Sequence, residues 1–174
     1  TKWILDPVHS ELGFKIKHMM ITNVKGRFKT FDGEIAVDGE DLETAIVNVT
    51  FETASVDTGH DQRDGHLRSP DFFDVTNFPN ITFKSTKVEL LGEDHFKVTG
   101  DLTVHGVTRT VVLDATLNKV GPNAMSGAQS IGFDATATLK RSDFGVGAYV
   151  PKVGDEIHIR ITTEGSVPKA GKAR

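Results

Sequence analysis

Hydrophobic and polar residues alternate with a period of two along most of the chain. Between Ser10 and His18, the apolar side chains of Leu12, Phe14 and Ile16 fall on one face, and charged neighbours fall on the other. The same alternation recurs in four further segments, residues 45–51, 107–117, 131–139 and 157–161. A period of two is typical of β-strands with one buried and one solvated face, which favours antiparallel sheet.

Weaker strand patterns fill the intervals between these segments. Residues 24–37 predict a strand with a break or bulge at 31–33. Residues 81–91 and 95–105 predict a hairpin whose tight turn contains Gly92. Residues 2–5 predict a short edge strand. The whole pattern therefore predicts about eight consecutive antiparallel strands with no long helix between them.

One segment, residues 57–79, interrupts the alternation. It is rich in charge, glycine and proline, and it is too long for a plain hairpin loop, which indicates a structured, functional loop. A short helical turn is expected over residues 62–69. It should end there, because Pro70 disfavours helical backbone in the residue before it.

The inward faces of these strands carry mostly Leu, Ile, Val, Phe and Ala, and no amphipathic helix is available to cover them. An antiparallel sheet of this kind can close on itself, which also removes its exposed edges. We therefore predict an all-β fold: one domain over residues 1–165 that forms a single eight-stranded antiparallel barrel with a short helical loop segment. Residues 166–174 are small, basic and aperiodic, and predict a flexible tail.

Small residues stand on the predicted inward faces where a filled core would favour large ones. They are Ala45, Ala115, Ala135 and Ala137. A dry void costs stability because its lining lacks contact partners, so retained space indicates a ligand. The alternative is a tight core in which neighbouring side chains compensate for each alanine.

Composition narrows the function further. The net charge is −4, which argues against nucleic-acid binding, and no apolar run is long enough to cross a bilayer. The absence of cysteine excludes thiol catalysis, disulfides and cysteine zinc sites. No signal peptide precedes Thr1, so we expect a cytoplasmic form, or a periplasmic form if a signal was removed.

Five strings, in order and with intact spacing, resemble the YceI family of lipid-binding proteins from about Trp3 to Glu164. They are DPVHSELGFKIKHMMITNVKGRF, DTGHDQRDGHLRSPDFFDVTNFPNITFKST, VTGDLTVHGVTRTVVL, LKRSDFGVG and VGDEIHIRI. The resemblance implies a lipocalin-like barrel that encloses a polyisoprenoid, an isoprenoid quinone or a similar long chain. It also implies no cofactor and no settled catalytic activity, so we expect a non-enzymatic lipid carrier or store. Export to the periplasm is frequent in the family, and homodimers are common.

Candidate ligand-binding residues fall into three groups. Polar groups are expected at the mouth of the barrel, where two arginines could bind a pyrophosphate head group or simply fix the long loop. Apolar groups of that loop are expected to form a lid or a satellite core, and strand residues to line the interior. The candidates are Phe14, Ile16, His18, Met19, Met20, Phe28, Val47, Val49, Phe51, Arg63, His66, Leu67, Arg68, Phe72, Phe73, Phe83, Phe133, Ala135 and Ala137, with His9 and Lys84 as further polar groups at the mouth.

Other functions remain as alternatives. His60, Asp61, Asp64 and His66 crowd together and could bind a divalent ion in a metal-dependent hydrolase, although their spacing matches no known ligand pattern. A serine hydrolase built on His9 and Ser10 is disfavoured, because neighbours in a strand point to opposite faces. A protein-binding module could use an exposed strand edge.

Overall fold

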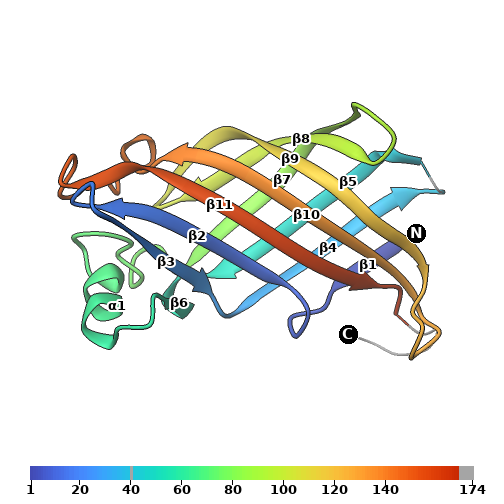
Figure 1. Ribbon diagram of the computed structural model, residues 1–174, viewed down its shortest axis with the longest axis horizontal. Helices are drawn as coiled ribbons and strands as arrows, with labels where there is room; N and C mark the ends of the chain where they lie inside the picture. The colour runs from blue at the N-terminus through green and yellow to red at the C-terminus, as the bar shows by residue number, and fades with distance from the viewer. Residues whose placement is uncertain (40, 169–174) are drawn as a thin grey trace.

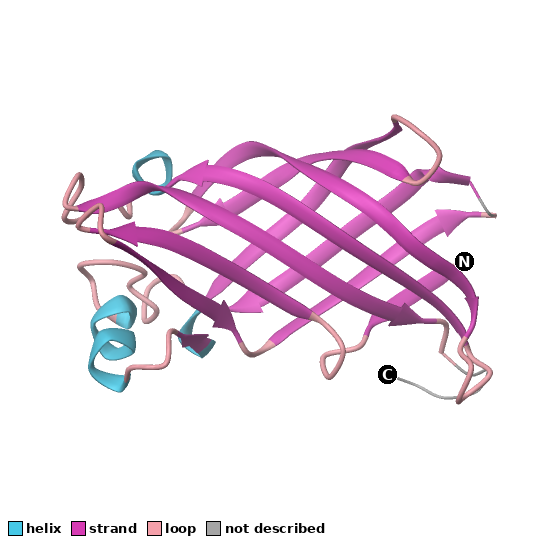
Figure 2. Ribbon diagram, in the orientation of Figure 1, coloured by secondary structure: helices cyan, strands magenta, loops and turns pink. Residues whose placement is uncertain are grey.

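The computed structural model describes residues 1–39 and 41–168 and consists almost entirely of antiparallel strands (Figures 1 and 2). In chain order the elements are β1 (Lys2–Leu5), β2 (Glu11–His18), β3 (Thr22–Phe28), β4 (Phe31–Asp38), β5 (Asp41–Glu52), η1 (Thr53–Ser55), β6 (Val56–Asp57), α1 (Asp61–Arg68), β7 (Asn80–Leu90), β8 (His95–Val104), β9 (Val107–Pro122), β10 (Gln129–Lys140), η2 (Arg141–Phe144) and β11 (Val153–Ser166). The predicted strands and the predicted helical turn are thus present.

Eight strands close into a ring. The hydrogen-bonded order is β1–β4–β5–β7–β8–β9–β10–β11, and β11 pairs back onto β1 through Ile4 with Ser166 and Leu5 with Gly165. The closed eight-stranded antiparallel barrel predicted from the alternation is confirmed. β1 pairs with β4 on one side and with β11 on the other, so the expectation that residues 2–5 form an edge strand is wrong.

Three positions of the barrel wall are each built from two short strands laid end to end. β2 and β1 follow one another along β11. β3 pairs with β2, and β4 pairs with β1, so β3 and β4 share the next position. β6 pairs with β3, and β5 pairs with β4, so β6 and β5 share the third. The break expected at residues 31–33 lies instead at Lys29 and Thr30. Their amides donate to the backbone oxygen and the Oγ of Ser55, at 3.1 and 3.0 Å, and so leave the strand ladder.

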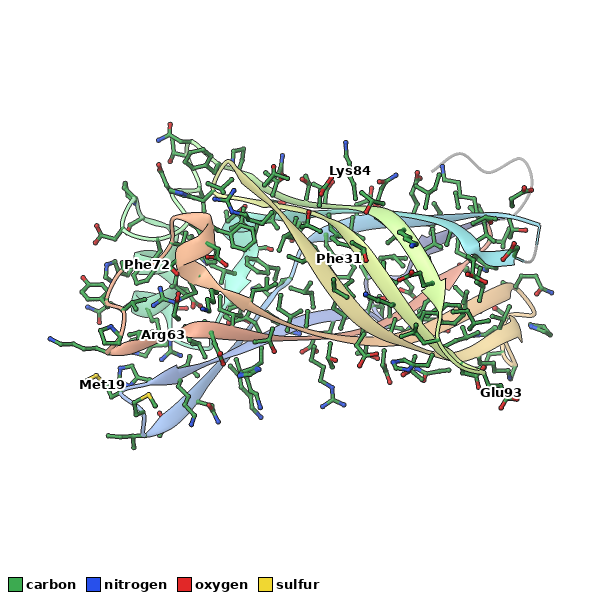
Figure 3. All side chains as sticks on the ribbon, turned by 90° about the horizontal axis from the view of Figure 1, so that it is seen from above. Met19, Phe31, Arg63, Phe72, Lys84 and Glu93 are labelled. Atoms are coloured by element: carbon green, nitrogen blue, oxygen red, sulfur yellow. The ribbon has the colours of Figure 1, made fainter. Side chains whose placement is uncertain are left out.

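The interior of the barrel is apolar, and its packing differs between the two ends. At the α1 end, Phe14, Phe28, Phe51 and Phe73 form a chain of rings with centroids 5.7 to 6.2 Å apart. At the opposite end, a smaller cluster gathers around Trp3 and Ile131. Outward residues such as Lys84 point into solvent (Figure 3). The two clusters therefore occupy the two ends of the barrel.

The helix α1 lies beside β6 at one end of the barrel (Figure 1). His60 caps its N-terminus by accepting a hydrogen bond from the Arg63 amide, and Ser69 ends it with extended backbone immediately before Pro70. None of the helices in the described residues has the length and hydrophobicity to span a bilayer. β11 ends at Ser166, and residues 169–174 of the predicted tail lie outside the described residues.

Candidate functional site

An apolar cavity of about 150 Å³ occupies the middle of the barrel. Side chains from all eight strands of the ring line it, and Phe31 marks its position in Figure 3. Seven of the predicted ligand-binding residues belong to this lining: Val47, Val49, Phe51, Phe83, Phe133, Ala135 and Ala137. A concave pocket lined by apolar side chains is the usual kind of site for an apolar ligand.

The exposure of the inward side chains indicates that protein atoms leave part of the lumen unfilled. Leu113, Ala137 and Ile159 point into the barrel, yet each is only half-buried. Their neighbours along the strands, such as Asp114 and Thr138, are exposed on the outer face. Inward side chains of a tightly packed barrel would be fully buried, so the remaining exposure of these residues belongs to the lumen.

The four small inward residues account for this space. Ala45, Ala115, Ala135 and Ala137 all line the cavity. Ala115 lies directly opposite Ala135 in the ladder between β9 and β10, so two methyl groups face the lumen where larger side chains would meet. The alternative of a tight core, in which neighbours compensate for each alanine, does not describe the barrel.

The polar residues of the cavity lining, Ser10, Glu11 and Thr163, lie where β11 changes its partner from β2 to β1, and Glu11 alone among the lining residues is exposed. The Ser10 hydroxyl donates to the backbone oxygen of Glu164 and accepts from its amide, at 3.3 and 3.1 Å, and so replaces the ladder at the break. This break in the wall could not be predicted, because its only signal in the sequence is a short interruption of the alternation before Ser10.

The two loop arginines donate hydrogen bonds to oxygens of the loop and of the residues just before it. Arg68 donates to the backbone oxygens of Ala54 and Val56, at 2.8 and 3.2 Å. Arg63 donates to the hydroxyl and the backbone oxygen of Thr58, both at 2.7 Å. Neither arginine lines the cavity. Their hydrogen bonds fit the interpretation in which they fix the long loop.

The apolar residues of the loop divide between two places. Leu67 and Phe73 pack on the barrel core, and the ring of Phe73 meets Phe28 edge-on at 5.8 Å. Phe72 instead packs against His66 and Tyr149, with ring centroids 5.0 and 5.8 Å away. The loop therefore plugs the α1 end with two side chains and leaves the third outside.

The remaining candidates lie away from the cavity. Phe14, Ile16 and Phe28 point inward beyond its α1 end, and none of them lines it. His18, Met19 and Met20 are exposed at the turn between β2 and β3. A role for any of these residues in ligand binding stays a prediction.

The suggested metal ligands of the loop do not converge. His60 caps α1, His66 pairs with Asp71 at 2.9 Å, and the buried Asp64 accepts hydrogen bonds from the amide and hydroxyl of Thr58. Asp61 is exposed in the first turn of α1. Each group thus has its own partner or faces solvent, and the loop assembles no common set of ligand atoms.

A different cluster of ionisable groups lies beside this break in the strand ladder. The Nδ1 atom of His9 is 2.7 Å from Asp6 and 3.7 Å from Glu164. The hydrogen bond with Asp6, and then the charges of Asp6 and Glu164, raise the pKa of His9 above its usual value. The hydrogen bond with His9 in turn lowers the pKa of Asp6. His9 contacts the carboxylates of Asp6 and Glu164, whereas the Ser10 hydroxyl bonds to the backbone of Glu164, and no hydrogen bond joins His9 to Ser10 in the described residues.

This pair gives the stability a predictable pH dependence. A raised pKa of His9 stabilises the fold below its ordinary value, about 6.5, and this contribution is lost as the pH rises through the folded pKa. A lowered pKa of Asp6 stabilises the fold above its ordinary value, about 3.9, and is lost as the pH falls through the folded pKa. We therefore expect His9→Gln to lower the melting temperature more at about pH 5.5 than at about pH 8.5. An equal difference from the parent protein at both pH values would contradict this assignment.

Residues 3–165 match the family model of the YceI-like domain. The chain belongs to the YceI-like family. This YceI-like chain is 40% identical over 157 residues to a UPF0312 protein of Pseudomonas syringae, covering 90% of the chain and 81% of the relative. Among solved structures it resembles BcnA of Burkholderia cenocepacia, with a TM-score of 0.83, 27% identity and coverage of 92% of this chain and 98% of BcnA.

A further structure shares the fold of this YceI-like chain. It is described as a polyisoprenoid binding domain from Saccharophagus degradans implicated in plant cell wall breakdown. The TM-score is 0.76 at 18% identity, and the match covers 95% of this chain and 98% of that domain. The family membership predicted from the five sequence strings is thus confirmed, as is the lipocalin-like barrel.

Proposed function

We propose that this YceI-like protein binds a long-chain lipophile, such as a polyisoprenoid, an isoprenoid quinone or a long acyl chain, inside its barrel. The observation that supports the proposal most strongly is the apolar cavity that four inward alanines leave in the lumen. A solved domain of the same fold is described as polyisoprenoid-binding, which agrees with this proposal. We propose the protein as a carrier or store of that molecule, without a catalytic role.

Simple energetics favour a long ligand. Burying one five-carbon isoprene unit contributes about 3–4 kcal/mol, at roughly 0.8 kcal/mol for each methylene. Association costs on the order of 4–15 kcal/mol in lost freedom of motion. One or two units barely offset this cost, whereas many units exceed it without any polar contact.

The size of the cavity sets a condition on such binding. A volume of about 150 Å³ is that of a dry protein cavity known to hold benzene, so a long chain must also displace parts of the wall. Phe31 and Phe133 line the cavity and are only half-buried, which leaves their rings room to turn. We therefore propose that the barrel widens around its ligand at these aromatic side chains.

The charges around the lumen favour recognition of the chain rather than of its head group. Glu11 is the one charged residue on the lining, and it lies at the rim. Arg63 and Arg68 already donate to oxygens of the loop and its neighbours. We propose that the head group stays near the polar lining residues Ser10 and Thr163 while the apolar chain fills the lumen.

The proposal is tested by organic extraction of the purified protein followed by mass spectrometry. We expect one class of long-chain lipophile at a near-stoichiometric ratio to protein, because the apolar lumen gains stability when it is filled. Protein stripped of lipid should then take up an added long polyprenol more tightly than a one-unit prenol. Extraction without any lipid, together with no uptake of the long polyprenol, would contradict the proposal.

The alternative of a partner-binding module is less favoured by the same geometry. Ring closure removes the free edges of the eight ring strands. Outside the ring, β3 pairs with β6 only through Arg27 and Phe28, so residues 22–26 have no ladder partner on that side in the part of the chain that the structure describes. Strand addition on an edge this short gives few main-chain hydrogen bonds. A homodimer stays a prediction from the family resemblance.

A further inference from the structure

The hairpin formed by β2 and β3 projects apolar side chains into solvent at its tip. Met19, Met20 and Ile21 are 50%, 71% and 83% exposed. Met19 and Met20 both have left-handed backbone, with φ of 54° and 59°, a conformation that turns usually assign to glycine or asparagine. Three large apolar residues thus occupy a strained turn where small polar residues are ordinary.

The apolar tip continues onto a neighbouring loop. The Met19 amide donates to the backbone oxygen of Lys152 at 2.8 Å, which joins the hairpin tip to the loop between η2 and β11. That loop exposes Tyr149 and Val150, by 55% and 40%. Met19 lies at the same end of the barrel as Phe72 (Figure 3). Met19, Met20 and Ile21 are called the hairpin patch below, and Tyr149 and Val150 are exposed on the adjoining loop.

The hairpin behind this patch is strongly basic, although the whole protein carries a net charge of −4. Between Leu12 and Phe31 the chain has no aspartate or glutamate. The same stretch contains five exposed cations, Lys15, Lys17, Lys25, Arg27 and Lys29. Positive charge is thus concentrated on one hairpin of an acidic protein.

The strand register places two of these cations directly opposite each other. Lys15 lies directly opposite Lys25 in the ladder between β2 and β3, and His158 of β11 is its partner on the other side. Like charges directly opposite one another destabilise a sheet. Elsewhere on the barrel, Lys87 and Lys97 reach Glu89 at 2.8 and 4.0 Å.

Within residues 1–39 and 41–168, the only ion pair on this hairpin joins Arg27 to Asp57, at 3.8 Å. The lysines of the hairpin thus lack the acidic neighbours that the lysines of β7 and β8 have. An anionic partner would supply the missing countercharge.

We propose that the hairpin docks the protein on an anionic lipid bilayer, with the hairpin patch in the interfacial region and the lysines on lipid phosphates. The apolar tip can enter the hydrocarbon boundary of such a bilayer, while the flanking lysines contact the negatively charged head groups. A nucleic acid would match the lysines but would offer no site for three neighbouring aliphatic side chains. The inference holds whatever the lumen contains.

The experiment is co-sedimentation of the full protein with vesicles of phosphatidylglycerol and phosphatidylcholine, or of phosphatidylcholine alone. We expect sedimentation with the anionic vesicles, weakened by added salt, and little sedimentation with phosphatidylcholine. The double variant Met20→Asp/Ile21→Asp should lower the bound fraction about tenfold, because it places charge in the apolar layer. Lys15→Gln/Lys25→Gln should lower binding and reduce its salt dependence.

Matched controls lie elsewhere on the barrel. Met125 is 97% exposed in the turn between β9 and β10, and Met125→Asp should bind like the parent protein. Lys87→Gln removes one exposed lysine of β7 and should also leave binding unchanged. Equal sedimentation with both vesicle types, or tip variants that bind like the parent, would overturn the proposal. So would complete displacement from the vesicles by a short DNA duplex together with no effect of the tip variants.

Discussion

Replacing Ala137 with phenylalanine should strongly weaken the uptake of a long lipophile and leave a folded barrel. Ala137 lines the cavity and lies opposite Ile159 of β11, so the new ring enters a space of about 150 Å³. Accommodating both the new ring and a long chain in the lumen costs about 1–3 kcal/mol, which lowers affinity about fivefold to 150-fold. The measurement is the lipid-to-protein ratio after extraction, together with binding of an added long polyprenol.

The neighbouring position supplies the control. Thr136 precedes Ala137 on β10 but is exposed on the outer face of the barrel. Thr136→Phe adds the same side chain outside the lumen and should retain the parent's lipid content. If Ala137→Phe binds lipid as the parent does, while its circular dichroism stays native, the ligand does not occupy the lumen.

Replacing Arg141 with methionine should cause a large loss of stability. Arg141 is 5% exposed, and its guanidinium donates to four backbone oxygens, those of Gly154, Val146, Ala148 and Val153, at 2.6 to 3.1 Å. Burial lowers the pKa of this guanidinium, and the charge of Asp155 opposes that shift. Arg141 thus joins the start of β11 to the loop that precedes it.

Methionine fills a similar length but donates no hydrogen bond, so the carbonyl groups lose their partner. Removing a buried, hydrogen-bonded charge of this kind costs about 3–5 kcal/mol. For a chain of this size each kcal/mol lowers the melting temperature by about 2–4 °C, so a fall of roughly 6–20 °C is expected in thermal unfolding.

Arg109 provides the matched control for Arg141. It is exposed, and its one hydrogen bond in the described part of the chain goes to the backbone oxygen of Thr108, at 3.1 Å. Arg109→Met should change the stability by no more than about 0.5 kcal/mol. Equal effects of the two substitutions would show that Arg141 does not hold the loop.

The long loop shows where prediction from sequence stops. Its helical turn could be predicted, because Pro70 ends the helix by local sterics. The partners of Arg63 and Arg68 could not, because Ala54, Val56 and Thr58 meet these side chains only after the loop folds back over β6. Charge and spacing alone favoured a loop anchor but left a head-group site open.

Local alternation was sufficient to predict the strands, their inward faces and a closed barrel, because a period of two assigns every side chain to one of two faces. The four alanines of the lumen were identified in the same way. The tertiary structure decided how strands separated in the chain meet. It paired β1 with β11, replaced the strand ladder at Ser10 by side-chain hydrogen bonds, and placed Lys15 opposite Lys25. These features depend on register between strands, which no single segment of sequence contains.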